Sequence, residues 1–234
     1  MNKKVNLRKY TTMAMFAALA FASLFVVHIG GIGGFLSFDV KDAIIITSAM
    51  IFGPISGAAI ALIVTFVEMI TISGTGIWGF LMNFISSATF AAGASALYRY
   101  MPNIKKTLAG AIFSLYTVAI LMTGLMLLMN VIITPLYIGP IEKYAQSLET
   151  VKGLLVPLLL PFNLLKSCAN ASIVLVIYKP IVSALRSMKL INEGVGQYKF
   201  GIKSIVMIVV GLVLAAGCVA IMILSLGGHI QFGK

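Results

Sequence analysis

The chain contains 234 residues, of which 60% are hydrophobic and only 10% are charged. An average soluble domain carries roughly 25% charged residues, so this composition excludes a soluble globular protein, a disordered chain and a secreted disulfide scaffold. An integral membrane protein built mainly from helices remains. We expect the net charge of +11 to reflect basic segments on one side of a membrane and not a nucleic-acid partner.

Apolar stretches predict seven membrane spans. They cover about 11–29, a block from 43 to 72 that Gly53-Pro54 divides into two, and then 79–98, 107–133, 154–178 and 204–226. The first stretch follows a basic start and lacks a small-x-small cleavage site, so we expect a spanning helix and not a removable signal. Proline disrupts a helix, so we expect residues 43–72 to form two helices, one of them short or irregular.

The basic residues support this count. With the N-terminus in the cytoplasm, seven spans place twelve lysines and arginines inside and four outside, and Lys166 falls within a span. The twelve are Lys3, Lys4, Arg8, Lys9, Arg99, Lys105, Lys106, Lys179, Arg186, Lys189, Lys199 and Lys203, and the four are Lys41, Lys143, Lys152 and Lys234. This is the positive-inside pattern. A single span over 43–72 would place every later connecting segment on the opposite side of the membrane.

One face of the first span carries small residues at steps of four, namely Ala14, Ala18 and Ala22. Such a face allows another helix to approach closely. The spacing is compatible with packing inside the bundle or with docking of a partner protein.

Polar residues inside predicted spans are candidates for function. Glu68, Asn83, Asn130 and Lys166 lie on four different spans at a similar depth in the outer half of the membrane. We therefore expect one shared cavity. The alternatives are a structural ion pair between Glu68 and Lys166, or side chains that extend to the membrane surface.

The outer segment from residue 30 to residue 42 is rich in glycine and also contains Leu36 and Phe38. Apolar side chains in a connecting segment suggest a loop that covers an apolar ligand. A pocket with amides, a carboxylate and an ammonium group suits a planar heteroaromatic ligand with donors and acceptors on its edge.

Enzymatic function is not expected. The sequence has no Walker motif, no nucleophile with a base beside it and no cluster of metal ligands, because His28 and His229 are each alone in their segments. Cys168 and Cys218 lie in apolar runs and are interpreted as packing residues.

Several motifs, in this order, resemble one known family. They are the alanine steps Ala14, Ala18 and Ala22; Leu36-Ser37-Phe38-Asp39; Phe52-Gly53-Pro54 with Gly57; Gly79-Phe80-Leu81-Met82-Asn83-Phe84; Met129-Asn130 followed by Thr134-Pro135-Leu136-Tyr137; and Leu160-Pro161-Phe162-Asn163-Leu164-Leu165-Lys166. Over residues 10–186 the chain resembles the substrate-binding S components of energy-coupling-factor (ECF) vitamin transporters, most of all the riboflavin-specific type.

The resemblance implies an all-α membrane protein with a six-helix bundle that binds riboflavin from outside, in a bacterial cell membrane. It implies that Asn83, Asn130, Lys166 and Glu68 contact the ligand and that Leu36 and Phe38 belong to a capping loop. It also implies that Ala14, Ala18 and Ala22 dock on a transmembrane coupling subunit, which works with two cytoplasmic ATPases. Riboflavin is then a transported ligand and not a cofactor.

Family members usually stop after six helices, and this chain continues. We expect a six-helix substrate-binding domain over 1–186, a basic cytoplasmic linker over 187–203 and an extra C-terminal transmembrane helix over 204–234, with the C-terminus outside. Two alternatives stay open: an S component for another flavin or vitamin, such as riboflavin phosphate (FMN), and a structural or assembly membrane protein without a small ligand.

Overall fold

The computed structural model describes residues 7–32, 36–102, 105–191 and 202–226. Its helices are α1 (Leu7–Val26), α2 (Lys41–Phe52), α3 (Pro54–Thr71), α4 (Gly76–Tyr100), α5 (Leu108–Ile133), α6 (Tyr144–Leu154), α7 (Leu160–Ser187) and α8 (Ile202–Leu226). Strands β1 (His28–Ile32) and β2 (Leu36–Asp39) lie between α1 and α2. Short helical segments η1 (Thr134–Leu136), η2 (Ile141–Lys143) and η3 (Leu155–Leu159) lie between α5 and α7.

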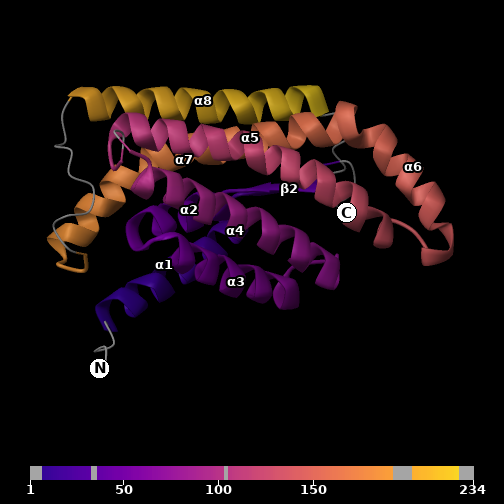
Figure 1. The fold of residues 1–234 in the computed structure, drawn as a ribbon, viewed down its shortest axis with the longest axis horizontal. Coiled ribbons are helices and arrows are strands. Elements are labelled where there is room, and N and C mark those ends of the chain that lie inside the picture. The colour runs from indigo at the N-terminus through magenta and orange to yellow at the C-terminus, as the bar shows by residue number, and fades with distance from the viewer. Residues whose placement is uncertain (1–6, 33–35, 103–104, 192–201, 227–234) are drawn as a thin grey trace.

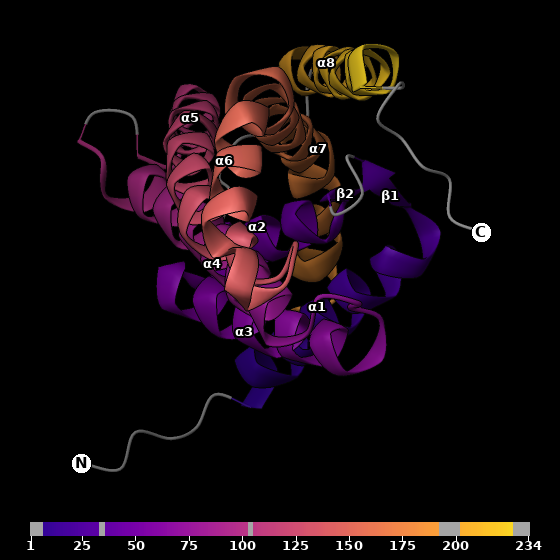
Figure 2. The ribbon, with the colours of Figure 1, turned by 90° about the vertical axis from the view of Figure 1, so that its right-hand side faces the viewer.

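The helices form one bundle with α2 in its interior (Figures 1 and 2). α2 packs against α1, α3, α4 and α7, and most of its side chains are buried. Five helical segments of the described chain are long and apolar enough to cross a membrane, namely Leu7–Val26, Pro54–Thr71, Gly76–Tyr100, Leu108–Leu136 and Ile141–Ser187. A multi-pass membrane protein follows from these lengths.

The break between α2 and α3 falls at Gly53 and Pro54, where the sequence predicts it. Gly53 has φ 110° and ψ 165°, a combination essentially restricted to glycine, and Pro54 begins α3, where a missing N–H is tolerated. Arg99 of α4 donates from Nη2 to the carbonyl oxygens of Met50 at 3.3 Å and Ile51 at 2.5 Å. One arginine thus satisfies carbonyl groups that the end of α2 leaves without helical partners.

The expected covering loop over residues 30–42 is only partly a loop, and that prediction needs correction. β1 and β2 pair antiparallel, with His28 opposite Asp39 and Ile29 opposite Phe38, and Lys41 and Asp42 already belong to α2. The tip of the hairpin, residues 33–35, lies outside the described residues. Pairing of the two strands gives the backbone amide and carbonyl groups of this segment partners within the protein.

The connection between α5 and α7 contains regular structure where the sequence predicts only an outer segment. It includes α6, and η3 is a π-helical turn that holds Pro157. Proline removes an amide donor, which accounts for the irregular turn where α6 continues toward α7.

α8 lies alongside α7 in both views of the bundle (Figures 1 and 2). The expected linker from 187 to 203 falls largely on residues 192–201, outside the described residues, as do Lys3, Lys4, Lys199, His229 and Lys234.

The Gly53 conformation predicts that Gly53→Ala lowers the stability of the fold by about 1–3 kcal/mol, because a Cβ strains this backbone region. The measurement is the Tm of purified protein in detergent, followed by circular dichroism. Gly124→Ala is the matched control, since a Cβ there meets nothing within 4 Å and alanine favours a helix. An unchanged Tm for Gly53→Ala would contradict the role assigned to this glycine.

Candidate ligand-binding site

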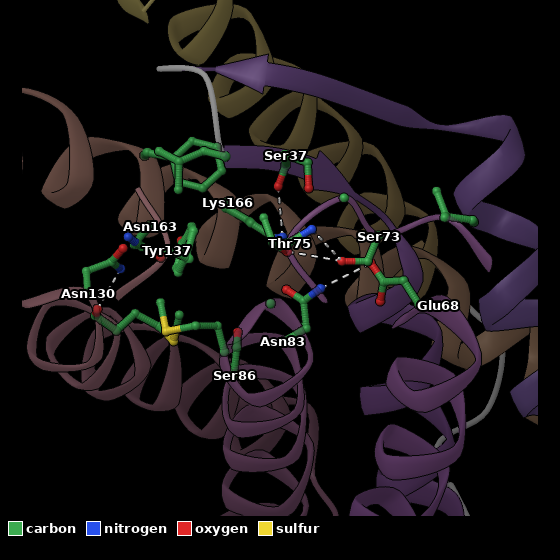
Figure 3. Close-up of a pocket in the computed structure, with 17 residues that line it drawn as sticks. Ser37, Glu68, Ser73, Thr75, Asn83, Ser86, Asn130, Tyr137, Asn163 and Lys166 are labelled. Carbon is green, nitrogen blue, oxygen red and sulfur yellow. Dashed lines mark hydrogen bonds between the residues drawn. The ribbon is translucent and has the colours of Figure 1, made fainter. Parts of the chain in front are cut away.

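A cavity of about 310 Å³ lies at one end of the bundle (Figure 3). Its walls come from the C-terminal ends of α3 and α5, the N-terminal ends of α4 and α7, strand β2 and the connection after η1. The lining residues are Leu36, Ser37, Glu68, Ile72, Ser73, Gly74, Thr75, Gly79, Met82, Asn83, Ser86, Met126, Asn130, Tyr137, Phe162, Asn163 and Lys166. Small-molecule sites typically measure roughly 300–1,000 Å³, so the cavity fits one compact ligand.

Five of the six predicted binding residues line this one cavity, namely Leu36, Glu68, Asn83, Asn130 and Lys166. They come from four helices and one strand that are far apart in the sequence. The cavity therefore combines a carboxylate, an ammonium group and carboxamides within a largely helical frame.

Glu68 has two partners at the cavity wall. Its Oε2 accepts from Lys41 Nζ at 2.6 Å, and its Oε1 accepts from Asn83 Nδ2 at 3.1 Å. The side chain is buried, with 7% of the residue exposed. Glu68 thus joins α2, α3 and α4 at the depth of the cavity.

Lys166 contacts strand β2. Its Nζ donates to the carbonyl oxygen of Ser37 at 3.0 Å and to Asp39 Oδ2 at 3.1 Å. Figure 3 shows Lys166 reaching toward Ser37 above the cavity. The alternative of a direct Glu68–Lys166 ion pair is wrong, because each of these two residues pairs with a charge from β2 or α2.

Sequence reasoning missed three charged residues beside the site. Asp39, Lys41 and Asp42 are 1–2% exposed, although the sequence places Lys41 in an outer connecting segment. Lys41 Nζ lies 3.8 Å from Asp39 Oδ2, and Asp42 Oδ1 accepts from Ser87 Oγ at 2.5 Å. One sequence signal could have found them: three charged residues stand directly before an apolar run that is too short to cross a membrane alone.

Asn170 is a fourth residue that the sequence did not single out. Its Oδ1 accepts from the backbone N–H of Ala43 at 3.1 Å, and its Nδ2 donates to the carbonyl oxygens of Asp39 and Lys166, each at 3.2 Å. The side chain therefore fixes the junction of β2 and α2 to α7. Its position four residues after Lys166 places both on one face of α7.

Carboxamides and a phenol form the opposite side of the cavity, where Figure 3 shows Asn130, Tyr137 and Asn163. Asn130 Nδ2 donates to the carbonyl oxygen of Met126 at 2.7 Å, and Asn163 Nδ2 donates to that of Leu159 at 2.8 Å. A carboxamide carries two N–H donors, so each of these bonds fixes a rotamer and uses one of the two. Burial raises the pKa of the Tyr137 phenol, which keeps its hydroxyl protonated.

The resemblance groups Leu36 and Phe38 as one cap, and both pack at the same apolar cluster, but only Leu36 also lines the cavity. Leu36 lines the cavity, whereas Phe38 is 2% exposed and packs against Leu158, Phe162 and Ala169. The cavity wall does not include Phe38. Alternate side chains of a strand point to opposite faces, so Phe38 turns toward this apolar cluster while Asp39 turns toward Lys166.

The alanine face of α1 is exposed. Ala14, Ala18 and Ala22 all lie on the surface of the bundle, whereas Phe16, Ala20 and Leu24 of the same helix are buried. Packing inside the bundle therefore does not explain the three alanines, which no described part of the chain covers.

The fold and the sequence both match a known family. Residues 8–178 match the family described as ECF transporter, substrate-specific component. A solved structure of the S component of a bacterial ECF transporter has a TM-score of 0.60 with this chain at 22% identity, and the match covers 76% of this chain and 97% of that one.

Two curated proteins are similar over most of their length. Riboflavin transporter RibU from Staphylococcus aureus (strain TCH60) is 25% identical over 189 residues, covering 79% of this chain and 97% of its own. Riboflavin transporter FmnP from Bacillus subtilis (strain 168) is 26% identical over 191 residues, covering 78% and 98%. The family is a component of a transporter and not an enzyme. Because its match spans more than half of the sequence, this chain belongs to the substrate-specific components of ECF transporters.

Proposed function

We propose that this chain binds riboflavin from the extracellular side of a bacterial cell membrane and serves its uptake as the substrate-specific subunit of an ECF transporter. The observation that carries the proposal is the cavity, in which polar side chains from α3, α4, α5 and α7 meet around an apolar space. In a membrane bundle such polar groups are retained mainly for function.

The chemistry of the cavity suits a flavin. Met82, Met126 and Phe162 offer apolar surface for a planar ring system, and Asn83, Asn130 and Asn163 offer donors and acceptors for polar groups at its edge. The names of the two similar curated proteins, both riboflavin transporters, support the same ligand.

The ion pairs favour riboflavin over its phosphate. The ammonium group of Lys166 already binds Asp39, and that of Lys41 already binds Glu68. A phosphate placed here would compete with a buried carboxylate for each cation, which is costly because an unpaired buried carboxylate would remain. We therefore expect FMN to bind more weakly than riboflavin.

The distribution of basic residues supports an extracellular cavity. The cavity lies where α3 and α5 end and where α4 and α7 begin. Arg99, Lys105, Lys106 and Arg186 lie near the other ends of these helices. By the positive-inside rule the basic end faces the cytoplasm, so the cavity opens toward the outside and the N-terminus is cytoplasmic.

The uncovered alanine face supports a helical partner in the membrane. Small side chains at Ala14, Ala18 and Ala22 permit close contact between helix backbones, which drives helix association in lipid. We assign this face to the transmembrane coupling subunit of the ECF module, whose two cytoplasmic ATPases supply the energy.

The first prediction concerns affinity. Lys166→Met and Asn130→Ala should each weaken riboflavin binding by about 1–3 kcal/mol, because a polar partner is lost, and this corresponds to a roughly 5- to 150-fold higher Kd. Quenching of riboflavin fluorescence measures the Kd, and a parallel titration with FMN and with an unrelated water-soluble vitamin tests the ligand class. Lys152→Met is the matched control, since Lys152 is exposed and pairs only with Glu149 of its own helix among the described residues. Wild-type affinity in both cavity variants would remove the site assignment.

The second prediction concerns orientation. With Cys168 and Cys218 replaced by alanine, a membrane-impermeant maleimide added to intact cells should label Glu149→Cys near the cavity end. Lys105→Cys should react only after permeabilisation. Both positions are exposed, so reactivity reports sidedness. The reverse pattern would contradict the proposed orientation.

The third prediction separates binding from uptake. Ala18→Trp should leave the Kd for riboflavin unchanged and abolish uptake of radiolabelled riboflavin, because a large ring prevents close helix contact. Ala109→Trp, at an exposed alanine of α5, is the control and should transport normally. Normal uptake by Ala18→Trp would exclude this face as the docking surface.

A further inference from the structure

α8 begins at Ile202, after the family match has ended at residue 178. It packs closely along α7, as Figures 1 and 2 show. A Cβ added at Gly211 would lie 2.9 Å from Val176 Cγ2 and 3.1 Å from the carbonyl oxygen of Ser172. Ala215, one turn further along, is buried. The contact therefore depends on small residues that let the two helices approach.

The C-terminal half of α8 reaches the cavity end of the bundle. Cys218 and Val219 pack against a cluster of buried side chains, which we name the cap cluster: Phe38, Leu158, Phe162 and Ala169. Gly211 contacts α7 near Ser172. Cys218, which comes later in α8, contacts a cluster whose α7 residues come before Ser172. α8 therefore runs antiparallel to α7. The two α8 side chains thus lie against the cluster that contains Phe38 of strand β2.

The cap cluster is joined directly to the cavity wall. Leu36 of β2 packs against the cluster and lines the cavity, and Phe162 belongs to both. β2 is therefore held from two directions, by Lys166 through Ser37 and Asp39 and by the apolar cluster on which Phe38 lies.

The contribution of α8 to this cluster is positional. Lipid tails are as apolar as valine, so removing Val219 from the cluster would not expose apolar surface to water. α8 differs from lipid because it presents a fixed surface with permanent van der Waals contacts, which fluid acyl chains do not supply. Loss of these contacts should loosen β2 without unfolding the bundle.

We propose that α8 is a positioning element for the ligand-capping strand: through Cys218 and Val219 it holds the cap cluster and β2 against the cavity and so slows ligand release. The part of this inference that concerns release rests on the proposed riboflavin binding. The part that concerns β2 does not depend on the identity of the ligand.

The test compares two leucine substitutions in the full-length protein in lipid nanodiscs. Gly211→Leu places a side chain in the α7 contact, whereas Gly217→Leu on the same helix enters a position at which a Cβ meets nothing within 4 Å. In ligand-free protein, amide hydrogen exchange over residues 36–39 should become about fivefold faster in Gly211→Leu. Riboflavin dissociation should accelerate by a similar factor, about fivefold. Gly217→Leu should match the wild type in both measurements.

A second pair of variants, with smaller changes in side-chain size, tests the proposal if Gly211→Leu misfolds. Val219→Ala removes two methyl groups from the cap cluster, and Val213→Ala changes a valine that is 66% exposed. Only the first should speed exchange over residues 36–39. Unchanged exchange in Val219→Ala would overturn the proposal, as would wild-type exchange in a folded Gly211→Leu protein.

The outcomes also separate the two hypotheses. Faster exchange together with unchanged riboflavin dissociation would overturn the role in ligand release. Faster exchange in a protein whose wild type binds no flavin would refute the proposed ligand and leave the role of α8 in holding β2 intact.

Discussion

A set of paired charges beside the cavity constrains the rest of the structure. Lys41 and Lys166 each bind a carboxylate, and the partners Glu68 and Asp39 come from other elements of the bundle. Breaking one such buried pair leaves an uncompensated charge, which typically destabilises a protein by about 3–5 kcal/mol. β2, α2, α3 and α7 must therefore hold one relative arrangement, and that arrangement shapes this side of the cavity wall.

Part of the site could be predicted because intramembrane polar residues are rare. Glu68 and Lys166 are conspicuous among apolar neighbours, and the span count assigns them a similar depth. Their charged partners were hidden, because Asp39 and Lys41 follow a glycine-rich segment that the sequence assigns to a connecting loop. Which carboxylate pairs with which ammonium group depends on the packing of four elements, and no local pattern contains that information. The resemblance groups Phe38 with Leu36, and the structure places Phe38 in the cluster with Leu158, Phe162 and Ala169, against which Leu36 also packs.

The helical bundle itself was predictable, and the S-component fold is confirmed. Hydropathy located the long helices, and the Gly53-Pro54 pair located the break that the structure has between α2 and α3. The β hairpin and α6 were missed because both are short. Elements of this size receive their stability from the bundle around them and not from their own sequence.

The second passage through the bundle has an unusual composition. α2 contains 12 residues and reaches about 18 Å, well short of a hydrocarbon layer of roughly 30 Å. The four extended residues of β2 add about 13 Å, so a strand and a helix together reach the length of one crossing. Its peptide groups and its charges Asp39, Lys41 and Asp42 need partners from α3, α4 and α7. A segment of this kind is unsuited to entering the bilayer alone during synthesis, and we expect it to settle only after α7, more than a hundred residues later in the chain, has been made.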